Sequence, residues 1–246
     1  AMAYSVQIYA DFSGYSDIAI GIGRLFGIEM MRNFSFPYFA RTVAEFWRSW
    51  HISLTSWFTE YLYIPLGGSR CGTFRTIVNT LIVFTLCGLW NGANWTFVIW
   101  GFLCGALFIP ILLDGGKSKQ KWKQIPVTFT FENVIHMALV FLAITVCWIF
   151  FRSISVEQAF DLLGCMFKNI TISSSVSVVT MVMPPIFFML LFSFVGIEWK
   201  GRNYNHGLDY LQKKSRFFRW TVYTLLIFSI FFYMQTEGGQ FIYQNF

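Results

Sequence analysis

Residues 46–68 have the sequence FWRSWHISLTSWFTEYLYIPLGG, a polar and Trp-rich stretch within an otherwise apolar chain. A second stretch of the same kind, CGLWNGANW, occupies residues 87–95. Lipid offers polar groups no hydrogen-bond partners, so a His, an Asn, an Arg and several hydroxyls at or near membrane depth indicate function. These two stretches are therefore where chemistry is expected.

The composition is that of a membrane protein. Of the 246 residues, 56% are hydrophobic and 12% are charged, whereas an average soluble domain carries about 25% charged residues. The many Phe and Trp residues suit a lipid-facing surface with Trp near the headgroups. The net charge of +6 falls mostly in two loops. It indicates membrane topology, with anionic lipid headgroups as partners, rather than nucleic-acid binding.

Apolar runs long enough to cross about 30 Å of hydrocarbon predict membrane-spanning helices. They lie at Tyr4–Ile28, Ile77–Trp90, Trp95–Leu113, Val134–Phe151, Val182–Ile197 and Trp220–Met234. Because no internal repeat or low-complexity tract is visible, we expect one all-α, multi-pass transmembrane helical bundle over residues 1–246. The chain opens directly in an apolar helix, which suggests that N-terminal helices are missing.

The pattern between Phe34 and Gly68 is amphipathic, with aromatic and aliphatic residues at helical spacing and polar residues mainly on the other face. It predicts an amphipathic or re-entrant helix that ends at the Pro and Gly residues of IPLGG. A second amphipathic stretch, Val156–Phe167, links two spans.

Basic loops indicate the orientation. The loop DGGKSKQKWK carries Lys117, Lys119, Lys121 and Lys123, and a second basic loop runs from Lys200 to Arg219. Both should face the cytoplasm. The turn CGLWNGANW and the C-terminal FIYQNF then lie toward the outer side. We expect the protein in the inner or plasma membrane of a cell.

The first apolar segment contains Asp11, Ser13, Tyr15 and Asp17. A carboxylate near the centre of a membrane helix costs about 2.5 to 3.5 kcal/mol, so each Asp should face the protein interior, water or a partner. These residues either contribute to a site or only hold helices together, for example by pairing with Arg24.

His51 follows Trp47 by four residues and Arg48 by three, so all three can share one edge of a helix. An imidazole there could move protons, orient a substrate hydroxyl, or only donate to a carbonyl. The dipeptide Asn91-Gly92 favours a turn or cap role for Asn91. The sequence contains no metal-ligand set, catalytic triad or phosphate-binding Gly loop. Its five Cys form no CxxC pair and are interpreted as small hydrophobic residues.

At these residues the chain resembles the membrane-bound O-acyltransferase (MBOAT) family, and within it the branch of alginate O-acetylation and D-alanyl transfer. The matching stretches are QIYADFSGYSDIAIGIGRLFGI, FPYFARTVAEFWRSWHISLTSWFTEYLYIPLGGSR, LCGLWNGANWTFVIWG and FIYQNF. The resemblance implies a ring-like bundle with a tunnel across the membrane. An acyl group held as a thioester on the cytoplasmic side, on coenzyme A or an acyl carrier, would reach a hydroxyl acceptor outside. No tightly bound cofactor is implied.

The resemblance also assigns residues. His51 matches the histidine of the family motif WHISL, a supporting residue of the site. Asn91 stands where the motif LWHGA has its histidine, the general base of the family. Asn cannot take a proton near neutral pH, so general-base catalysis, worth about 10² to 10⁴ in rate, should be lost there. Three explanations stay open: an inactivated variant, a natural non-catalytic partner, or a member that uses His51 instead.

We therefore expect an O-acyltransferase that moves an acyl group, with acetyl favoured, onto a hydroxyl of an exported polysaccharide or cell-envelope polymer. The candidate catalytic residues are His51 and Asn91. The candidate substrate-binding residues are Asp11, Ser13, Tyr15, Asp17, Arg48, Trp90 and Trp95. The alternative is a catalytically degenerate scaffold in the bilayer that recruits an acyl carrier or an extracytoplasmic partner transferase. A transporter is disfavoured because no inverted repeat is visible.

Overall fold

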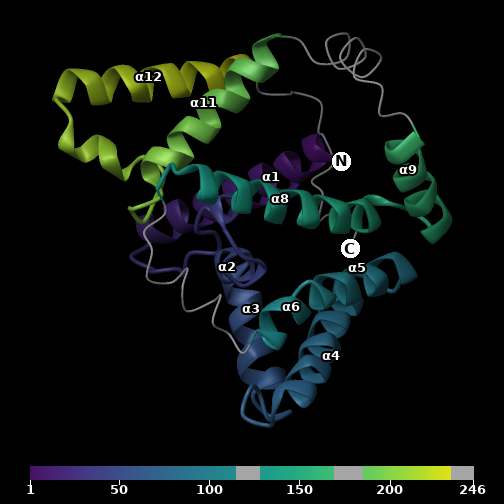
Figure 1. Ribbon diagram of the computed structural model, residues 1–246. Coiled ribbons are helices and arrows are strands. Elements are labelled where there is room, and N and C mark those ends of the chain that lie inside the picture. Colours follow the sequence, from purple (N-terminus) through teal and green to yellow (C-terminus); the bar gives the residue numbers. More distant parts are fainter. Residues whose placement is uncertain (115–127, 169–184, 234–246) are drawn as a thin grey trace. The chain divides into compact units, whose positions relative to one another are not determined.

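A computed structural model describes residues 1–114, 128–168 and 185–233, which are helical with connecting turns and contain no strand (Figure 1). The chain divides into two compact units, residues 1–170 and 171–245, each of which is taken by itself. The Lys117–Lys123 loop and the C-terminal FIYQNF lie outside the described residues. The expectation of a single domain over residues 1–246 stays a prediction.

The helices of the first unit begin with α1 (Met2–Leu25), the 3₁₀ turn η1 (Pro37–Phe39), α2 (Val43–Ser49), α3 (Ile52–Phe58) and the π-helical turn η2 (Thr59–Tyr63). They continue with α4 (Thr73–Asn91), α5 (Trp95–Ala106), α6 (Ile109–Leu113), α8 (Phe131–Arg152) and α9 (Val156–Lys168). The second unit contains α11 (Pro185–Gly201), the 3₁₀ turn η3 (Asp209–Lys213) and α12 (Arg216–Tyr233).

Within the described residues, three helical segments are long and apolar enough to cross a membrane: Thr73–Asn91, Trp95–Leu113 and Phe131–Arg152. They confirm three of the predicted spans. The second of them is interrupted between α5 and α6, where Pro110 lacks the N–H that a continuous helix needs. The other predicted spans are helical in α1, α11 and α12.

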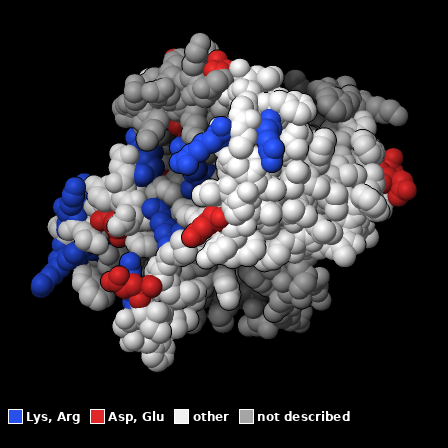
Figure 2. All heavy atoms as spheres, turned by 90° about the horizontal axis from the view of Figure 1, so that it is seen from below, with Lys and Arg blue, Asp and Glu red and all other residues white. Residues whose placement is uncertain are grey.

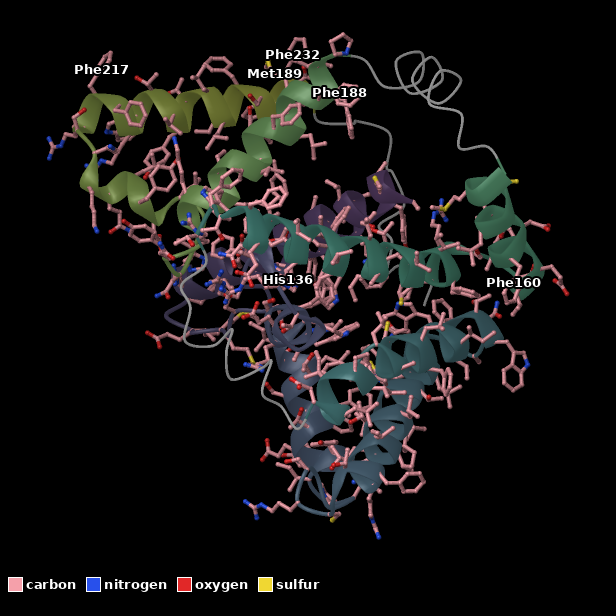
Figure 3. The ribbon with its side chains drawn as sticks, in the orientation of Figure 1. His136, Phe160, Phe188, Met189, Phe217 and Phe232 are labelled. Atoms are coloured by element: carbon pink, nitrogen blue, oxygen red, sulfur yellow. The ribbon has the colours of Figure 1, made fainter. Side chains whose placement is uncertain are left out.

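The outer surface of these helices is apolar. Broad areas of the face shown in Figure 2 carry no Lys, Arg, Asp or Glu. Helix α12 has no buried residue, and Phe217 and Phe232, labelled near its two ends in Figure 3, are 84% and 82% exposed. Such surfaces are unstable in water and suit lipid.

Helices α4 and α5 pack through facing glycines. A Cβ added at Gly88 would lie 2.2 Å from the carbonyl oxygen of Phe97, and one added at Gly101 would lie 2.2 Å from that of Phe84. Both obstacles are backbone atoms, which cannot rotate away. Small residues therefore set the distance between α4 and α5.

An aromatic core joins α2, α5 and α8. The ring of Trp148, 1% exposed on α8, lies 5.1 Å from that of Trp50 and is stacked 5.5 Å from that of Trp100 on α5. Trp50 in turn is stacked on Phe46 of α2, with 5.4 Å between the ring centroids. Large flat rings bury much area with few rotatable bonds, so they fix how these helices meet.

The amphipathic segment is helical, but the prediction of one helix is wrong. Helix α2 ends at Ser49, and α3 begins at Ile52. Between them Trp50 is extended and His51 is left-handed, with φ 43° and ψ 57°. Trp47, Arg48 and His51 therefore do not share one helix edge. The second amphipathic segment, α9, is helical as predicted.

Replacing Gly88 by Ala should destabilise the protein, because the new methyl group would meet the backbone of α5. We expect a loss of about 1–3 kcal/mol, seen as a lower apparent Tm of the detergent-solubilised protein. Gly14→Ala on α1 is the matched control, since nothing lies within 4 Å of its added Cβ. Equal Tm values for the two variants would contradict the close packing of α4 and α5.

Candidate functional site

The corner between α2 and α3 is tied to the segment that precedes η1. The backbone N–H of Ile52 donates to the carbonyl of Asn33 at 2.9 Å, and that of Ser35 donates to the carbonyl of Ser49 at 2.9 Å. These bonds flank His51 on both sides. They hold His51 in a left-handed backbone conformation, which costs a non-glycine residue on the order of 1 kcal/mol or more.

The side chain of His51 lies against α1. Its ring meets Phe12 edge-on, with 4.7 Å between the ring centroids. Its Nδ1 lies 3.4 Å from Oγ of Ser53, a long hydrogen bond. Burial lowers the pKa of His51 to about 4. The imidazole is therefore neutral at pH 7 and has a nitrogen that can accept a proton.

A small polar network around His51 determines which of its two ring nitrogens can accept a proton. Ser53 Oγ donates its one proton to Oδ1 of Asn33 at 2.6 Å, and the backbone N–H of Ser53 donates to the same oxygen at 3.2 Å. Asn33 Nδ2 donates to Ser16 Oγ on α1 at 3.5 Å. Because the Ser53 proton is already used, this hydroxyl faces Nδ1 of His51 as an acceptor. The contact assigns the tautomer with hydrogen on Nδ1, which leaves Nε2 as the basic atom.

Three members of this cluster, Ser16, Asn33 and Ser53, were not predicted from the sequence. Asn33 stands 20 residues before Ser53 and 17 after Ser16, and neither spacing is a helical one. Ser53 could have been predicted, because it is a hydroxyl residue only two positions after His51. Ser16 and Phe12 are one helical turn apart on α1, which would have marked the face that meets His51.

The four α1 residues singled out from the sequence lie elsewhere on that helix. Asp11 and Ser13 are half-buried, and Ser13 Oγ donates to the carbonyl of Ala10 at 3.5 Å. Tyr15 and Asp17 are exposed. The hydrogen bonds around His51 reach α1 at Ser16.

Asn91 is the last residue of α4 and is 9% exposed. Its Nδ2 donates to the carbonyl of Cys87 at 2.7 Å, and Gly92 follows it. This is the behaviour of a residue that closes a helix, as its turn dipeptide predicts. Trp90 and Trp95 flank the turn and are 59% and 73% exposed.

A chain of aromatic side-chain contacts connects the two Trp-rich stretches. Within the described residues, no hydrogen bond joins His51 to Asn91. Trp50, next to His51, contacts Trp148; Trp148 contacts Phe151 at 5.3 Å between centroids. Phe151 contacts Phe97 at 5.1 Å, and the Phe97 ring lies beside Gly92. The aromatic core therefore fixes both stretches within the same unit.

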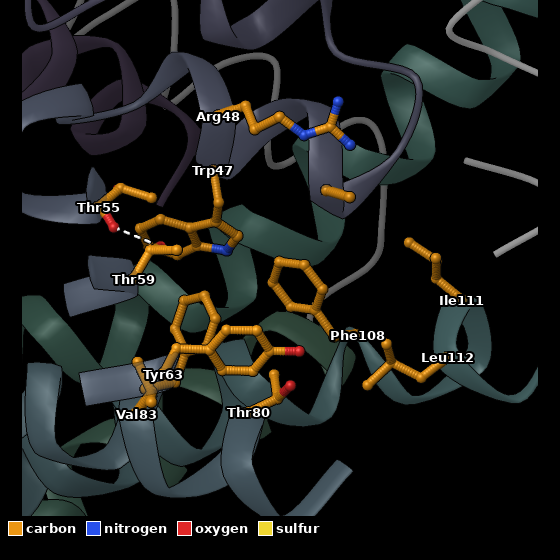
Figure 4. A pocket seen from close by; sticks show the side chains of 12 residues that line it. Trp47, Arg48, Thr55, Thr59, Tyr63, Thr80, Val83, Phe108, Ile111 and Leu112 are labelled. Carbon is orange, nitrogen blue, oxygen red and sulfur yellow. Dashed lines mark hydrogen bonds between the residues drawn. The ribbon is translucent and has the colours of Figure 1, made fainter. Parts of the chain in front are cut away.

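Arg48 lines a cavity that His51 does not line. It is an exposed residue in the last turn of α2 and lines a cavity of about 350 Å³ together with residues of α3, η2, α4 and α6 (Figure 4). His51 is not among the described residues that line this cavity. Within the described residues, no group of three or more His, Cys, Asp or Glu side chains could hold a metal ion.

Comparison with known sequences identifies a protein family that part of this chain matches. Residues 1–113 match the sequence model of MBOAT, the membrane-bound O-acyltransferase family. This segment contains the corner at His51 and the whole of α4 with Asn91. Residues 1–113 therefore belong to the membrane-bound O-acyltransferase family.

Individual relatives narrow the branch. The chain is 44% identical over 169 residues to the probable alginate O-acetylase AlgI of Pseudomonas putida, covering 68% of this chain and 33% of the relative. It is 40% identical over 163 residues to the peptidoglycan O-acetyltransferase of Helicobacter pylori, covering 66% and 30%. It is 27% identical over 128 residues to the teichoic acid D-alanyltransferase of Bacillus subtilis, covering 49% and 31%. The chain thus spans about a third of the length of these curated relatives.

The lowered pKa of His51 predicts acid sensitivity. The unfolded chain takes up a proton at His51 below its ordinary pKa of 6.5, whereas the folded protein resists it down to about 4. The free energy of unfolding therefore loses nothing at His51 above pH 6.5. It falls as the pH drops from 6.5 toward 4, by at most about 3 kcal/mol from this residue. His51→Gln should remove this part of the acid dependence of the apparent Tm.

His206→Gln, which changes a histidine of the second unit, is the control and should keep the acid dependence of the unmodified protein. An acid slope that is the same in all three proteins would show that His51 is not held neutral by burial.

Proposed function

We propose that the protein is a membrane-bound O-acyltransferase that moves an acetyl group from a thioester donor to a hydroxyl of an exported polysaccharide or cell-envelope polymer. The observation that supports this most is that burial keeps His51 neutral while its Nδ1 contacts Ser53, which leaves Nε2 as the basic atom. The named functions of relatives on alginate and peptidoglycan support the acceptor class.

The reaction requires one base. The acceptor hydroxyl oxygen attacks the thioester carbonyl carbon, the C–S bond breaks, and an ester forms. The hydroxyl proton passes to Nε2 of His51 and from there to the departing sulfur, so that a thiol leaves and His51 ends neutral. Ser53 and Asn33 keep the ring in place during this step.

Asn91 contributes no base in this proposal. Its amide nitrogen is engaged by the carbonyl of Cys87, and its neutral amide oxygen only accepts hydrogen bonds. We assign Asn91 the position of the base in related enzymes and His51 the proton transfer. Asp11, Ser13, Tyr15 and Asp17 on α1, and Trp90 and Trp95 at the turn, are carried forward as candidate substrate contacts.

The setting we propose is a multi-pass protein of the inner or plasma membrane. Its basic loops face the cytoplasm, where coenzyme A or an acyl carrier supplies the thioester, and the turn at Asn91 faces the acceptor outside. An extracytoplasmic partner transferase is a further candidate partner.

A second function is favoured by one observation. The amide nitrogen of Asn91 donates to the carbonyl of Cys87, as expected of a residue that closes a helix and takes no part in catalysis. The protein would then be a scaffold that recruits a partner transferase or an acyl carrier, with no transfer of its own.

Acetyl transfer by the whole protein in proteoliposomes separates the two functions. With a radiolabelled acetyl thioester inside and an oligosaccharide acceptor outside, the unmodified protein should transfer label, and His51→Ala should lower the rate by about 10² to 10⁴. His136→Gln, on α8, is the matched control and should leave the rate within a factor of about two.

Asn91→His distinguishes the alternatives. If the unmodified protein is inactive and Asn91→His gains orders of magnitude, the base belongs at position 91 and our assignment to His51 is wrong. If all variants stay at background while a partner transferase still binds, the protein is a scaffold.

A further inference from the structure

The cavity beside Arg48 has two contrasting walls. One is apolar and comes from the membrane-crossing segments, with Val83 and Phe84 of α4, Phe108, and Leu112 of α6. The other carries Trp47 and the hydroxyl side chains of α3, η2 and α4 (Figure 4). A cavity with this division suits a molecule that is apolar along one side and polar at defined points.

Trp47 presents an unused hydrogen-bond donor there. The residue is 6% exposed, and its indole Nε1 has no hydrogen-bond partner among the described residues. Figure 4 shows this nitrogen on the side of the ring that faces Phe108 and Tyr63. A buried N–H without a partner is costly, so an acceptor oxygen in the cavity would offset that cost.

Arg48 presents an unused charge. No hydrogen bond or ion pair joins it to another described residue, whereas Arg41 seven residues earlier pairs with Glu45 at 2.8 Å. It is the only charged side chain among the described residues that line the cavity. In Figure 4 its guanidinium lies at the end opposite Tyr63 and Thr80. A single anionic group therefore suits this end.

The hydroxyls of Thr59 and Thr80, which line the cavity, are already used as donors and cannot donate to a ligand. Thr59 Oγ1 donates to the carbonyl of Thr55 at 2.7 Å, and Thr80 Oγ1 donates to that of Thr76 at 2.8 Å. Burial raises the pKa of Tyr63, so its phenol keeps its proton at neutral pH. The phenol of Tyr63 is hydrogen-bonded to the side chain of Thr80, so the cavity offers one cation and an indole N–H to a ligand that brings acceptor oxygens.

We propose that this cavity binds one anionic membrane phospholipid. Its phosphodiester lies at Arg48, an ester carbonyl accepts from Trp47 Nε1, and an acyl chain follows the apolar wall at Phe84, Phe108 and Leu112. This site is independent of the proposed acyl transfer, because the network around His51 shares no residue with it.

Two observations favour a phospholipid over the nucleotide end of a coenzyme A thioester. The cavity provides one cation, which balances one phosphodiester and not the several phosphate charges of coenzyme A. Its apolar wall also comes from segments long and apolar enough to cross the membrane, which lipid chains reach directly.

Native mass spectrometry of the whole protein in a mild detergent measures this binding. With phosphatidylglycerol and phosphatidylcholine supplied in equal amounts, the unmodified protein should retain phosphatidylglycerol preferentially. Arg48→Gln should weaken retention of phosphatidylglycerol about tenfold, and Arg48→Lys should keep part of the preference. Arg75→Gln, at an exposed arginine of α4 outside the cavity, is the matched control and should retain the lipid fully.

Trp47→Phe tests the second contact, because it removes the N–H and keeps a ring. It should weaken retention of both lipids, whereas Trp57→Phe, at an exposed Trp outside the cavity, should not. Equal retention in Arg48→Gln and Arg75→Gln would overturn the proposal. Displacement of the bound lipid by a non-reactive thioether analogue of acetyl coenzyme A, dependent on Arg48, would assign the cavity to the donor instead.

Discussion

The break between α2 and α3 at Trp50 and His51 is the constraint on which the rest of the first unit depends. Two backbone hydrogen bonds to the segment at Asn33 and Ser35 hold the left-handed residue. They turn successive side chains in different directions, so that Trp50 enters the aromatic core and His51 meets α1. A continuous helix would place these two side chains only about 100° apart on one surface. The corner separates a packing role from a chemical one.

The aromatic core and the contact between Gly88 and Gly101 connect this corner to the second polar stretch, residues 87–95. Trp148 joins Trp50 to α5, and the facing glycines fix α5 against α4, at whose end Asn91 lies. Both contacts are rigid because one rests on large rings and the other on backbone atoms. The corner at His51 and the turn at Asn91 thus lie in a single packed unit.

Much of this fold could be predicted from the sequence, because apolar length and turn residues are local signals. They gave the spans at α4, α5–α6 and α8, and the cap role of Asn91. The break at His51 could not be predicted, since a left-handed histidine leaves the helical spacing of its neighbours unchanged. Nor could the contact of Ser53 with Asn33, because it depends on how the corner folds back. The sequence therefore named His51 as a candidate, which stays a prediction, and did not name the residues that hydrogen-bond around it.

The central claim is that His51 is a neutral base whose Nε2 is available for a proton. Nitrogen-15 NMR of the whole protein with labelled histidine, with the His51 signals assigned by their loss in His51→Gln, tests this directly. At pH 7 the account predicts a neutral ring with a protonated Nδ1 and a bare Nε2. A charged imidazolium, or a ring with its proton on Nε2, would contradict it.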